Sequence, residues 1–251
     1  MSKNQKKIWV TGASSGIGKA VAEKFANEGW KVAVSARRKE KLDEIASSNS
    51  NIISYPLDVV NKENCQTTFN KIAEEFGDID ICFFCSGTYD PKKEKEIDLD
   101  QNKFVMDVNY FGVLNCVKSV EKYFKNKKSG QISIVSSIAG YRGLPNSSGY
   151  GPSKAALTNF AESIYFDFKK FNVRVSVVSP GFIKTDLTDK NEFKMPFLRS
   201  TDYAAEKVFK GLTSTNSFEI HFPKQLTLIL KFLRVLPYKI YLFLVDKLVK
   251  R

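Results

Sequence analysis

A tyrosine and a lysine four residues apart, Tyr150 and Lys154, are the pair best suited to chemistry in this sequence. In a helix, residues four apart lie on one face. The pKa of a free tyrosine is about 10, and a neighbouring ammonium group stabilises the phenolate and lowers that pKa. Tyr150 could therefore exchange protons as a general acid or base. The spacing also fits an ordinary surface helix, but Ser137 lies thirteen residues earlier, at the end of a predicted strand where ligands bind in open α/β sheets.

A glycine-rich segment offers a place for a nucleotide beside that chemistry. It lies between an apolar run at 8–10 and a helical pattern that begins at Gly16. Glycines let the backbone turn closely around a pyrophosphate, and the free N–H groups of a helix start favour an anion. A glycine loop alone also fits an ordinary turn, but its position between strand and helix indicates a dinucleotide site. The candidate contacts are Gly12, Ser14, Ser15, Gly16, Ile17 and Gly18.

The elements that must position these residues alternate between short apolar runs and helical patterns. We expect strands at 8–10, 32–34, 52–53, 79–84, 132–135 and 173–178, and helices at 16–29, about 38–47, about 62–76, about 101–125 and 152–171. Continuously apolar strands are typical of a sheet covered on both faces. The sequence therefore predicts an α/β fold, a single doubly wound parallel sheet with helices on both faces. Residues 1–222 would form this domain, and 223–251 a basic amphipathic helical extension.

Several motifs in order resemble the short-chain dehydrogenase/reductase family, from residue 7 to about residue 190. They are T-G-x-x-x-G-x-G at 11–18, Val108-Asn109-Tyr110, Ser136-Ser137-Ile138-Ala139-Gly140 and Tyr150-Gly151-Pro152-Ser153-Lys154. Cys85-Ser86-Gly87 stands where the family usually has Asn-Ala-Gly. The resemblance implies a Rossmann fold and an NAD(P)-dependent oxidoreductase acting on CH–OH or C=O groups.

The resemblance also implies roles for the matching residues. Ser137, favoured over its neighbour Ser136, would donate a hydrogen bond to the substrate carbonyl. Lys154 would also hold the nicotinamide ribose, and Asn109 would hold a water that connects Lys154 to solvent. The residues expected to meet the cofactor beyond the glycine loop are Asp58 and Val59 at the adenine, and Pro180, Gly181, Ile183 and Thr185 at the nicotinamide. Asp58 fits a helix cap equally well.

The residues after the second strand favour NADP(H) over NAD(H). An NAD site needs a carboxylate about 20 residues past the glycine loop to bind the ribose 2′-hydroxyl. This stretch reads Ser35-Ala36-Arg37-Arg38, with no acid before Glu40. The guanidinium groups of Arg37 and Arg38 suit a 2′-phosphate by charge and geometry, and Ser35 could add a hydrogen bond. The alternative is a solvated basic helix start, which the helix dipole disfavours.

Together these residues predict an NADPH-dependent carbonyl reductase, in which Tyr150 protonates the oxygen of a ketone. The alternative is a non-catalytic dinucleotide-binding regulatory or scaffold protein. The complete set of Asn109, Ser137, Tyr150 and Lys154 favours the enzyme. Relatives commonly pair their long helices, so we expect a homodimer or homotetramer. We expect residues 184–200 to form a mobile substrate lid, with Phe182, Met195 and Phe197 either lining an apolar pocket or packing as ordinary core.

Composition bounds the remaining possibilities. Hydrophobic residues are 43% of 251, enough for a core without disulfides. Cys82 and Cys85 are three positions apart in a buried strand, so they point to opposite faces. The only histidine, His221, is remote in sequence, so we expect no metal site. The lysine-rich start leads straight into a strand rather than a secretory segment, which favours a cytoplasmic protein.

The positive charge is concentrated near the C-terminus. The net charge is +12, and residues 222–251 hold seven basic side chains and one acid. A charge confined to one end argues against nucleic acid and favours an anionic surface or partner. Apolar residues follow helical spacing from Leu226 to Leu236 and from Ile240 to Leu248, too short to span a bilayer. The extension would either pack on its own domain or a partner subunit, or make peripheral contact with a membrane. Membrane contact would fit a lipidic ketone as substrate, or a protein that serves only as a membrane-recruited binding module.

Overall fold

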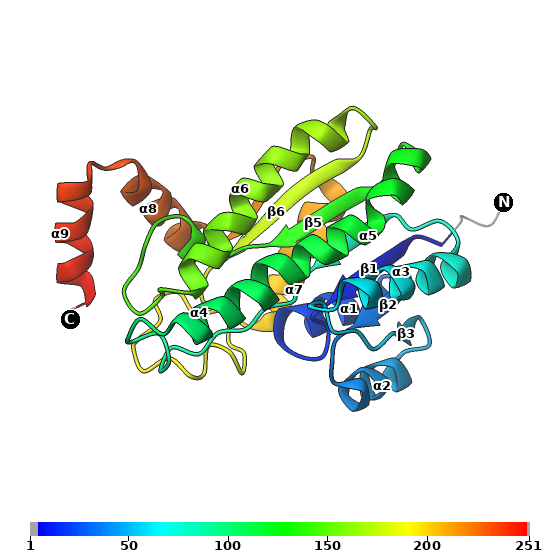
Figure 1. The fold of residues 1–251 in the computed structure, drawn as a ribbon, viewed down its shortest axis with the longest axis horizontal. Coiled ribbons are helices and arrows are strands. Elements are labelled where there is room, and N and C mark those ends of the chain that lie inside the picture. Colours follow the sequence, from blue (N-terminus) through cyan, green and yellow to red (C-terminus); the bar gives the residue numbers. More distant parts are fainter. Residues whose placement is uncertain (1–4, 250–251) are drawn as a thin grey trace.

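The computed structural model describes residues 5–249, so Lys3, Lys250 and Arg251 and the side chain of Leu248 lie outside the described residues. Seven parallel strands form one sheet in the order β3-β2-β1-β4-β5-β6-β7 (Figure 1). The strands are β1 (Lys7–Thr11), β2 (Lys31–Ser35), β3 (Ile52–Ser54), β4 (Ile81–Phe84), β5 (Gln131–Val135), β6 (Arg174–Pro180) and β7 (Glu219–Phe222). Because the strand order reverses next to β1, a crevice forms at the carboxyl ends of β1 and β4.

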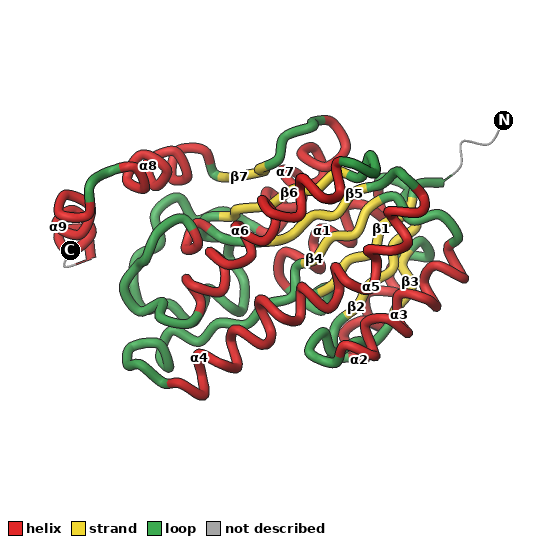
Figure 2. The backbone as a smooth tube through the Cα atoms, turned by 45° about the horizontal axis from the view of Figure 1, so that its top comes forward, coloured by secondary structure: helices red, strands yellow, loops and turns green. Residues whose placement is uncertain are grey.

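Helices lie along both sides of the strands (Figure 2). They are α1 (Gly16–Asn27), α2 (Lys39–Ser48), α3 (Lys62–Phe76), α4 (Leu99–Met106), the π-helix η1 (Asp107–Phe111), α5 (Gly112–Lys127), the 3₁₀-helix η2 (Ile138–Gly140), α6 (Tyr150–Lys169), α7 (Thr201–Ser214), α8 (Lys224–Val235) and α9 (Tyr238–Val249). None of the helices in the described part of the chain is long and apolar enough to cross a membrane.

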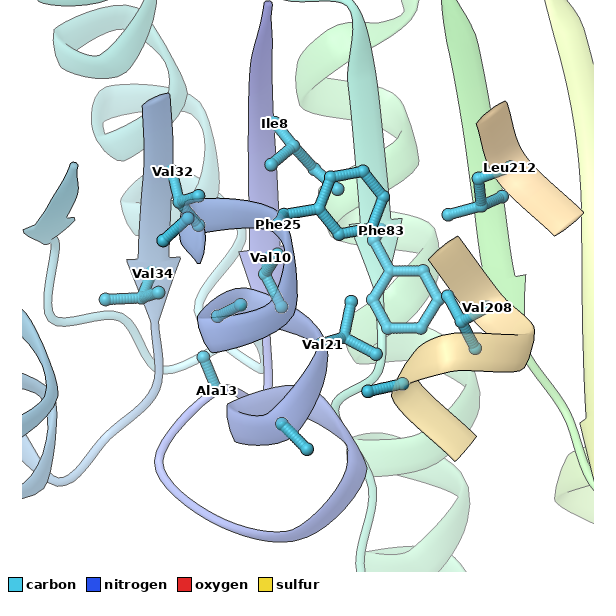
Figure 3. Packing of buried hydrophobic residues seen from close by; sticks show 14 of the residues in the cluster. Ile8, Val10, Ala13, Val21, Phe25, Val32, Val34, Phe83, Val208 and Leu212 are labelled. Carbon is cyan, nitrogen blue, oxygen red and sulfur yellow. The ribbon is translucent and has the colours of Figure 1, made fainter. Parts of the chain in front are cut away.

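Side chains from successive strand residues enter two separate cores. Ile8 and Val10 of β1 pack with α1, α2 and α7, whereas Trp9 between them packs with α3, α5 and α6. Figure 3 shows the first core, in which Phe25 of α1 and Val208 of α7 lie on either side of Phe83 of β4. The inner strands β1, β2 and β4 therefore consist mostly of apolar residues, because both of their faces are covered.

This architecture confirms the predicted α/β fold, and the predicted strands and helices lie within a few residues of the observed ones. Cys82 packs in the α3–α5–α6 core and Cys85 against the other, which confirms their opposite directions. Three elements were not predicted: α7, the edge strand β7 and the short 3₁₀-helix η2. The predicted helix at 101–125 is a continuous run of α4, η1 and α5 with a π turn at Asn109.

The C-terminal extension is helical, as predicted, and packs partly on its own domain. Leu226 of α8 is buried against Ile138 and Tyr141, and Leu233 is buried with Tyr241 and Val245 of α9. Figure 1 shows the two helices at one end of the molecule, with α9 farthest from the sheet. The division into domains at residue 222 stays a prediction.

Candidate active site

A cavity of about 390 Å³ opens at the carboxyl ends of the strands. The predicted cofactor residues other than Ser35 line it, as do Ser137, Tyr150 and Lys154. Among the four predicted catalytic residues, Asn109 is the one that does not line the cavity. The lining residues follow β1, β2, β4, β5 and β6 in sequence, so the parallel topology brings them together from distant parts of the chain.

Two glycines let the backbone pack closely at the turn before α1. Gly12 has a φ of +69°, and a Cβ there would lie 2.7 Å from the backbone of Cys85 and Ser86. A Cβ on Gly18 would lie 2.3 Å from the carbonyl oxygen of Gly12. The Ser15 side chain makes no capping hydrogen bond, so the first N–H groups of α1 remain for an anion. This cradle fits the pyrophosphate of a dinucleotide.

Arg38 connects the glycine loop to the start of α2. Its guanidinium donates to Ser14 Oγ at 2.8 Å and to Ser15 Oγ at 3.0 Å, and the side chain is exposed at the cavity. Arg37 also lines the cavity. The prediction for Ser35 is wrong: this serine is fully buried, does not line the cavity, and its hydroxyl accepts a hydrogen bond from Trp9 Nε1 at 2.9 Å. The cavity thus presents two guanidinium groups after β2.

Asp58 does not cap the helix that follows it. Asn61 caps α3 by accepting a hydrogen bond from the Asn64 N–H, whereas Asp58 Oδ1 accepts from Val60 N at 3.1 Å in a tight turn. Asp58 and Val59 line the cavity. The cap alternative is therefore wrong, and a position beside the adenine remains the better interpretation.

Tyr150 is the first residue of α6, and its ring packs against that of Tyr89, with 4.7 Å between ring centroids and an angle of 46° between the ring planes. Burial raises the pKa of Tyr150 to about 12, although the hydrogen-bonding side chain of Ser137 acts to lower it. The sequence predicted a lowered pKa. The direction is reversed here because removing the phenolate from water outweighs the nearby polar groups.

Lys154 lies one turn further along α6 and is buried. Its ammonium donates to the Val135 carbonyl oxygen at 2.9 Å, and it lies 5.7 Å from the centroid of the Tyr150 ring. Burial lowers the pKa of Lys154 to about 8. The amine and the phenol therefore share one helix face, as predicted, and each favours its neutral form more than in water.

The two serines after β5 have different partners. Ser136 Oγ donates to the Lys154 carbonyl oxygen at 2.7 Å and contacts Thr158 Oγ1 at 2.8 Å, which ties β5 to α6. Ser137 Oγ accepts a 3.2 Å hydrogen bond from Ala139 N and forms a hydrogen bond with the Tyr150 hydroxyl. This difference supports Ser137 as the serine that meets a substrate.

Asn109 is buried behind the cavity, within the π turn. Its Oδ1 accepts from Thr88 N at 2.6 Å, and its Nδ2 donates to the Thr88 carbonyl and to Ser153 Oγ, each at 3.0 Å. The side chain therefore fixes the loop after β4 to α6. Its role in holding a water stays a prediction. π turns occur frequently at functional sites, but nothing in the sequence indicated this one.

Glu94 is a residue that the sequence did not single out. It is buried in the loop after β4, and its carboxylate accepts from Tyr150 N at 3.0 Å and from Gly149 N at 3.1 Å. It thus binds the N-terminal N–H groups of the helix that carries Tyr150. Burial raises the pKa of this carboxyl group. The contact spans 56 residues of sequence, so no local pattern could have indicated it.

The predicted lid, residues 184–200, is a loop closed at its base by a bridge between Ile183 and Arg199. None of the three residues expected to form an apolar pocket lines the cavity: Phe182 packs against the Ile138 cluster, Met195 accepts from Asn191, and Phe197 is 43% exposed. The cavity is instead lined by the start of this loop, at Asp186, Leu187, Thr188 and Lys190.

Fold and cavity define an α/β protein of the Rossmann type with a nucleotide-binding crevice. A sequence profile described as short chain dehydrogenase matches residues 6–196. An uncharacterized oxidoreductase of Myxococcus xanthus is 33% identical over 232 residues, covering 91% of each chain. The 2,3-dihydro-2,3-dihydroxybenzoate dehydrogenase of Bacillus subtilis is 32% identical, covering 82% of this chain and 78% of that one.

Among solved structures, ElxO with NADP bound has a TM-score of 0.76 and 28% identity, over 86% of this chain and 97% of that chain. The protein therefore belongs to the short-chain dehydrogenase/reductase family and is an oxidoreductase. This confirms the resemblance drawn from its motifs.

Proposed function

We propose that the protein is an NADPH-dependent carbonyl reductase that converts an apolar or lipidic ketone to a secondary alcohol. One observation carries the proposal: a single cavity combines the Arg38 guanidinium after β2 with Ser137, Tyr150 and Lys154 around β5 and α6. The apolar nature of the substrate is proposed from the neighbouring C-terminal helices, because Leu226 of α8 lies beside Gly181 and packs against Ile138, the residue after Ser137.

Different groups of residues along the cavity would each bind one part of the nucleotide. The Gly12–Gly18 cradle and the first turn of α1 would bind the pyrophosphate. Arg37 and Arg38 would bind the 2′-phosphate, and Asp58 and Val59 would meet the adenine. The ribose and nicotinamide would contact Lys154, Pro180, Gly181, Ile183 and Thr185. When bound, this cofactor supplies the hydride that adds to the carbonyl carbon.

Tyr150 provides the proton. A pKa of about 12 keeps its phenol protonated at neutral pH, as an acid that protonates the substrate oxygen must be. As the electron pair of the C=O π bond moves onto oxygen, the phenol O–H bond breaks and a new O–H bond forms on the substrate. Ser137 donates a hydrogen bond to that oxygen. The Lys154 ammonium stabilises the phenolate that remains.

NADPH oxidation against a panel of ketones graded by chain length tests the function. We expect turnover that improves with the length of the apolar chain. If NADPH binds but no ketone is reduced and no alcohol oxidised, the chain is instead a non-catalytic dinucleotide-binding regulatory or scaffold protein.

We also propose that two or four copies pair through their long helices. Phe111 on η1 and Phe166 on α6 are exposed, which supports a contact there. Light scattering of the purified chain measures the number of copies. A cytoplasmic location stays a prediction.

A further inference from the structure

Exposed apolar side chains are concentrated on α8 and α9. Single exposed apolar residues are normal on protein surfaces, but clusters of them mark interaction sites. Here Phe232 is 64% exposed, Val235 76% and Tyr238 75%. The exposed large apolar residues of the two helices are Leu228, Ile229, Phe232, Val235, Tyr238, Ile240, Leu242 and Phe243. We call this set the apolar surface of the hairpin, the hairpin being residues 224–249.

The hairpin is held in a defined arrangement. Arg142 donates to the carbonyl oxygens of Leu233 at 3.0 Å and Leu236 at 2.7 Å, at the end of α8. The same guanidinium lies 4.0 Å from the ring centroid of Tyr241, whose hydroxyl donates to the Gly143 carbonyl at 2.6 Å. Leu226, Leu233 and Tyr241 form the buried inner side of the hairpin. The apolar surface is therefore a second apolar face of the hairpin, in addition to the one that packs on the domain.

The charges around the apolar surface are almost all positive. Lys224, Arg234, Lys239 and Lys247 are exposed, and Asp246 is the one acidic residue within 224–249. Lys231, the remaining cation of the described hairpin, forms a salt bridge with Glu219. Apolar residues with neighbouring cations are complementary to an anionic surface that also accepts apolar groups.

We propose that the hairpin binds an anionic lipid surface. Its helices have 12 residues each, or about 18 Å, so they can lie in the interface and cannot span it. A second copy of the chain fits less well, because a symmetric contact would place the same cations opposite one another. The position of both helices at one end of the molecule lets them meet a flat surface without obstruction by the sheet (Figures 1 and 2).

The hairpin is also next to the candidate active site. A Cβ on Gly181 would lie 3.0 Å from Leu226 Cδ2, and Leu226 contacts Ile138, the neighbour of Ser137. A lipid surface bound here would therefore bring membrane-dissolved ketones close to the cavity. This consequence rests on the proposed function, whereas lipid binding itself does not.

Vesicle sedimentation of the full chain tests the proposal. We expect binding to vesicles of phosphatidylcholine with phosphatidylserine and much weaker binding to phosphatidylcholine alone. Lys239→Gln with Lys247→Gln should weaken binding about thirtyfold at low salt, since each cation near an anionic surface contributes about a factor of five. Phe232→Ser with Val235→Ser should weaken it at least tenfold. Matched controls are Lys170→Gln, at the end of α6, and Ile97→Ser, in the loop after β4. Both residues are exposed, and both variants are expected to bind as the natural chain does.

Equal binding to both vesicle types, or no binding to either, would overturn the proposal. So would light scattering that shows the hairpin variants dissociating a dimer of the natural chain. Circular dichroism should be unchanged, because the substituted side chains are exposed. Reduction of a water-soluble ketone should also be unchanged in these variants. Tyr150→Phe, in contrast, should bind vesicles normally, so failure of the reductase assignment and failure of lipid binding are distinguishable.

Discussion

Burial decides the electrostatics of the two central side chains. The sequence correctly predicted that Tyr150 and Lys154 lie on one face of a helix, because spacing along a helix is a local property. It gave the wrong direction for the pKa of Tyr150, because desolvation depends on the chain that folds over α6 from elsewhere. Ser35 was misassigned for the same reason: its hydroxyl bonds to Trp9 across the sheet.

The buried amine makes stability depend on pH. Burial lowers the pKa of Lys154 from 10.5 to about 8. Below about pH 8 both folded and unfolded chains carry the charge, so the folded chain bears the full cost of burying it, about 3 kcal/mol. Between about pH 8 and 10.5 the folded chain releases the proton first, and the cost declines. The free energy of unfolding of the natural chain, relative to Lys154→Met, should therefore rise with pH across this window.

Denaturant unfolding near neutral pH and near pH 10.5 measures this difference. Lys169→Met, an exposed position on the same helix, should show no such trend. If the difference in unfolding free energy between the natural chain and Lys154→Met does not change with pH, the pKa of Lys154 is not lowered by burial.

Arg38 should determine the choice of cofactor. Removing one charge-assisted hydrogen bond to a 2′-phosphate costs about 1.5–3 kcal/mol, so Arg38→Ala should weaken NADPH binding about tenfold to a hundredfold and NADH binding much less. Fluorescence titration with both nucleotides measures the ratio, with Lys41→Ala, exposed one turn along α2, as the control. Equal losses for both nucleotides would remove the 2′-phosphate assignment.

At the scale of elements, long-range contacts determine where the helix that carries Tyr150 begins. We predicted that this helix begins at residue 152, whereas it begins at Tyr150, where Glu94 binds the first N–H groups. The π turn at Asn109 likewise positions a side chain that bonds to Thr88 and Ser153. Both features depend on contacts between distant segments, so periodicity could not reveal them.

Glu94 should act as a positioning residue for Tyr150. Glu94→Ala leaves two N–H groups at the start of α6 without their acceptor, and we expect a loss of about 1–3 kcal/mol in unfolding free energy. Because Tyr150 would be less well fixed, kcat should fall more than the KM for the ketone rises. Glu94→Gln, which keeps an acceptor oxygen, should recover part of kcat.

Glu96→Ala, in the same loop but exposed, serves as the control and should leave kcat and stability unchanged. The positioning role is wrong if Glu94→Ala loses stability while kcat stays at the natural value.

At the scale of the whole molecule, the sequence predicted the parallel sheet because the inner strands, such as β1 and β4, are apolar on both faces. It predicted the cavity because strand ends of a doubly wound sheet must converge. It missed β7, a four-residue edge strand, and α7, which packs over the first core. The sequence did not decide whether the extension packs on protein or on a membrane. The structure shows a hairpin that is buried on one side and has exposed apolar residues on the other.

The most direct test of the central claim is the Tyr150→Phe variant, compared with Tyr165→Phe further along the same helix. Ketone reduction should be abolished in Tyr150→Phe and normal in Tyr165→Phe, while both bind NADPH as the natural chain does. Ketone reduction by Tyr150→Phe at the natural rate would contradict the account, because it would show that the phenol does not supply the proton.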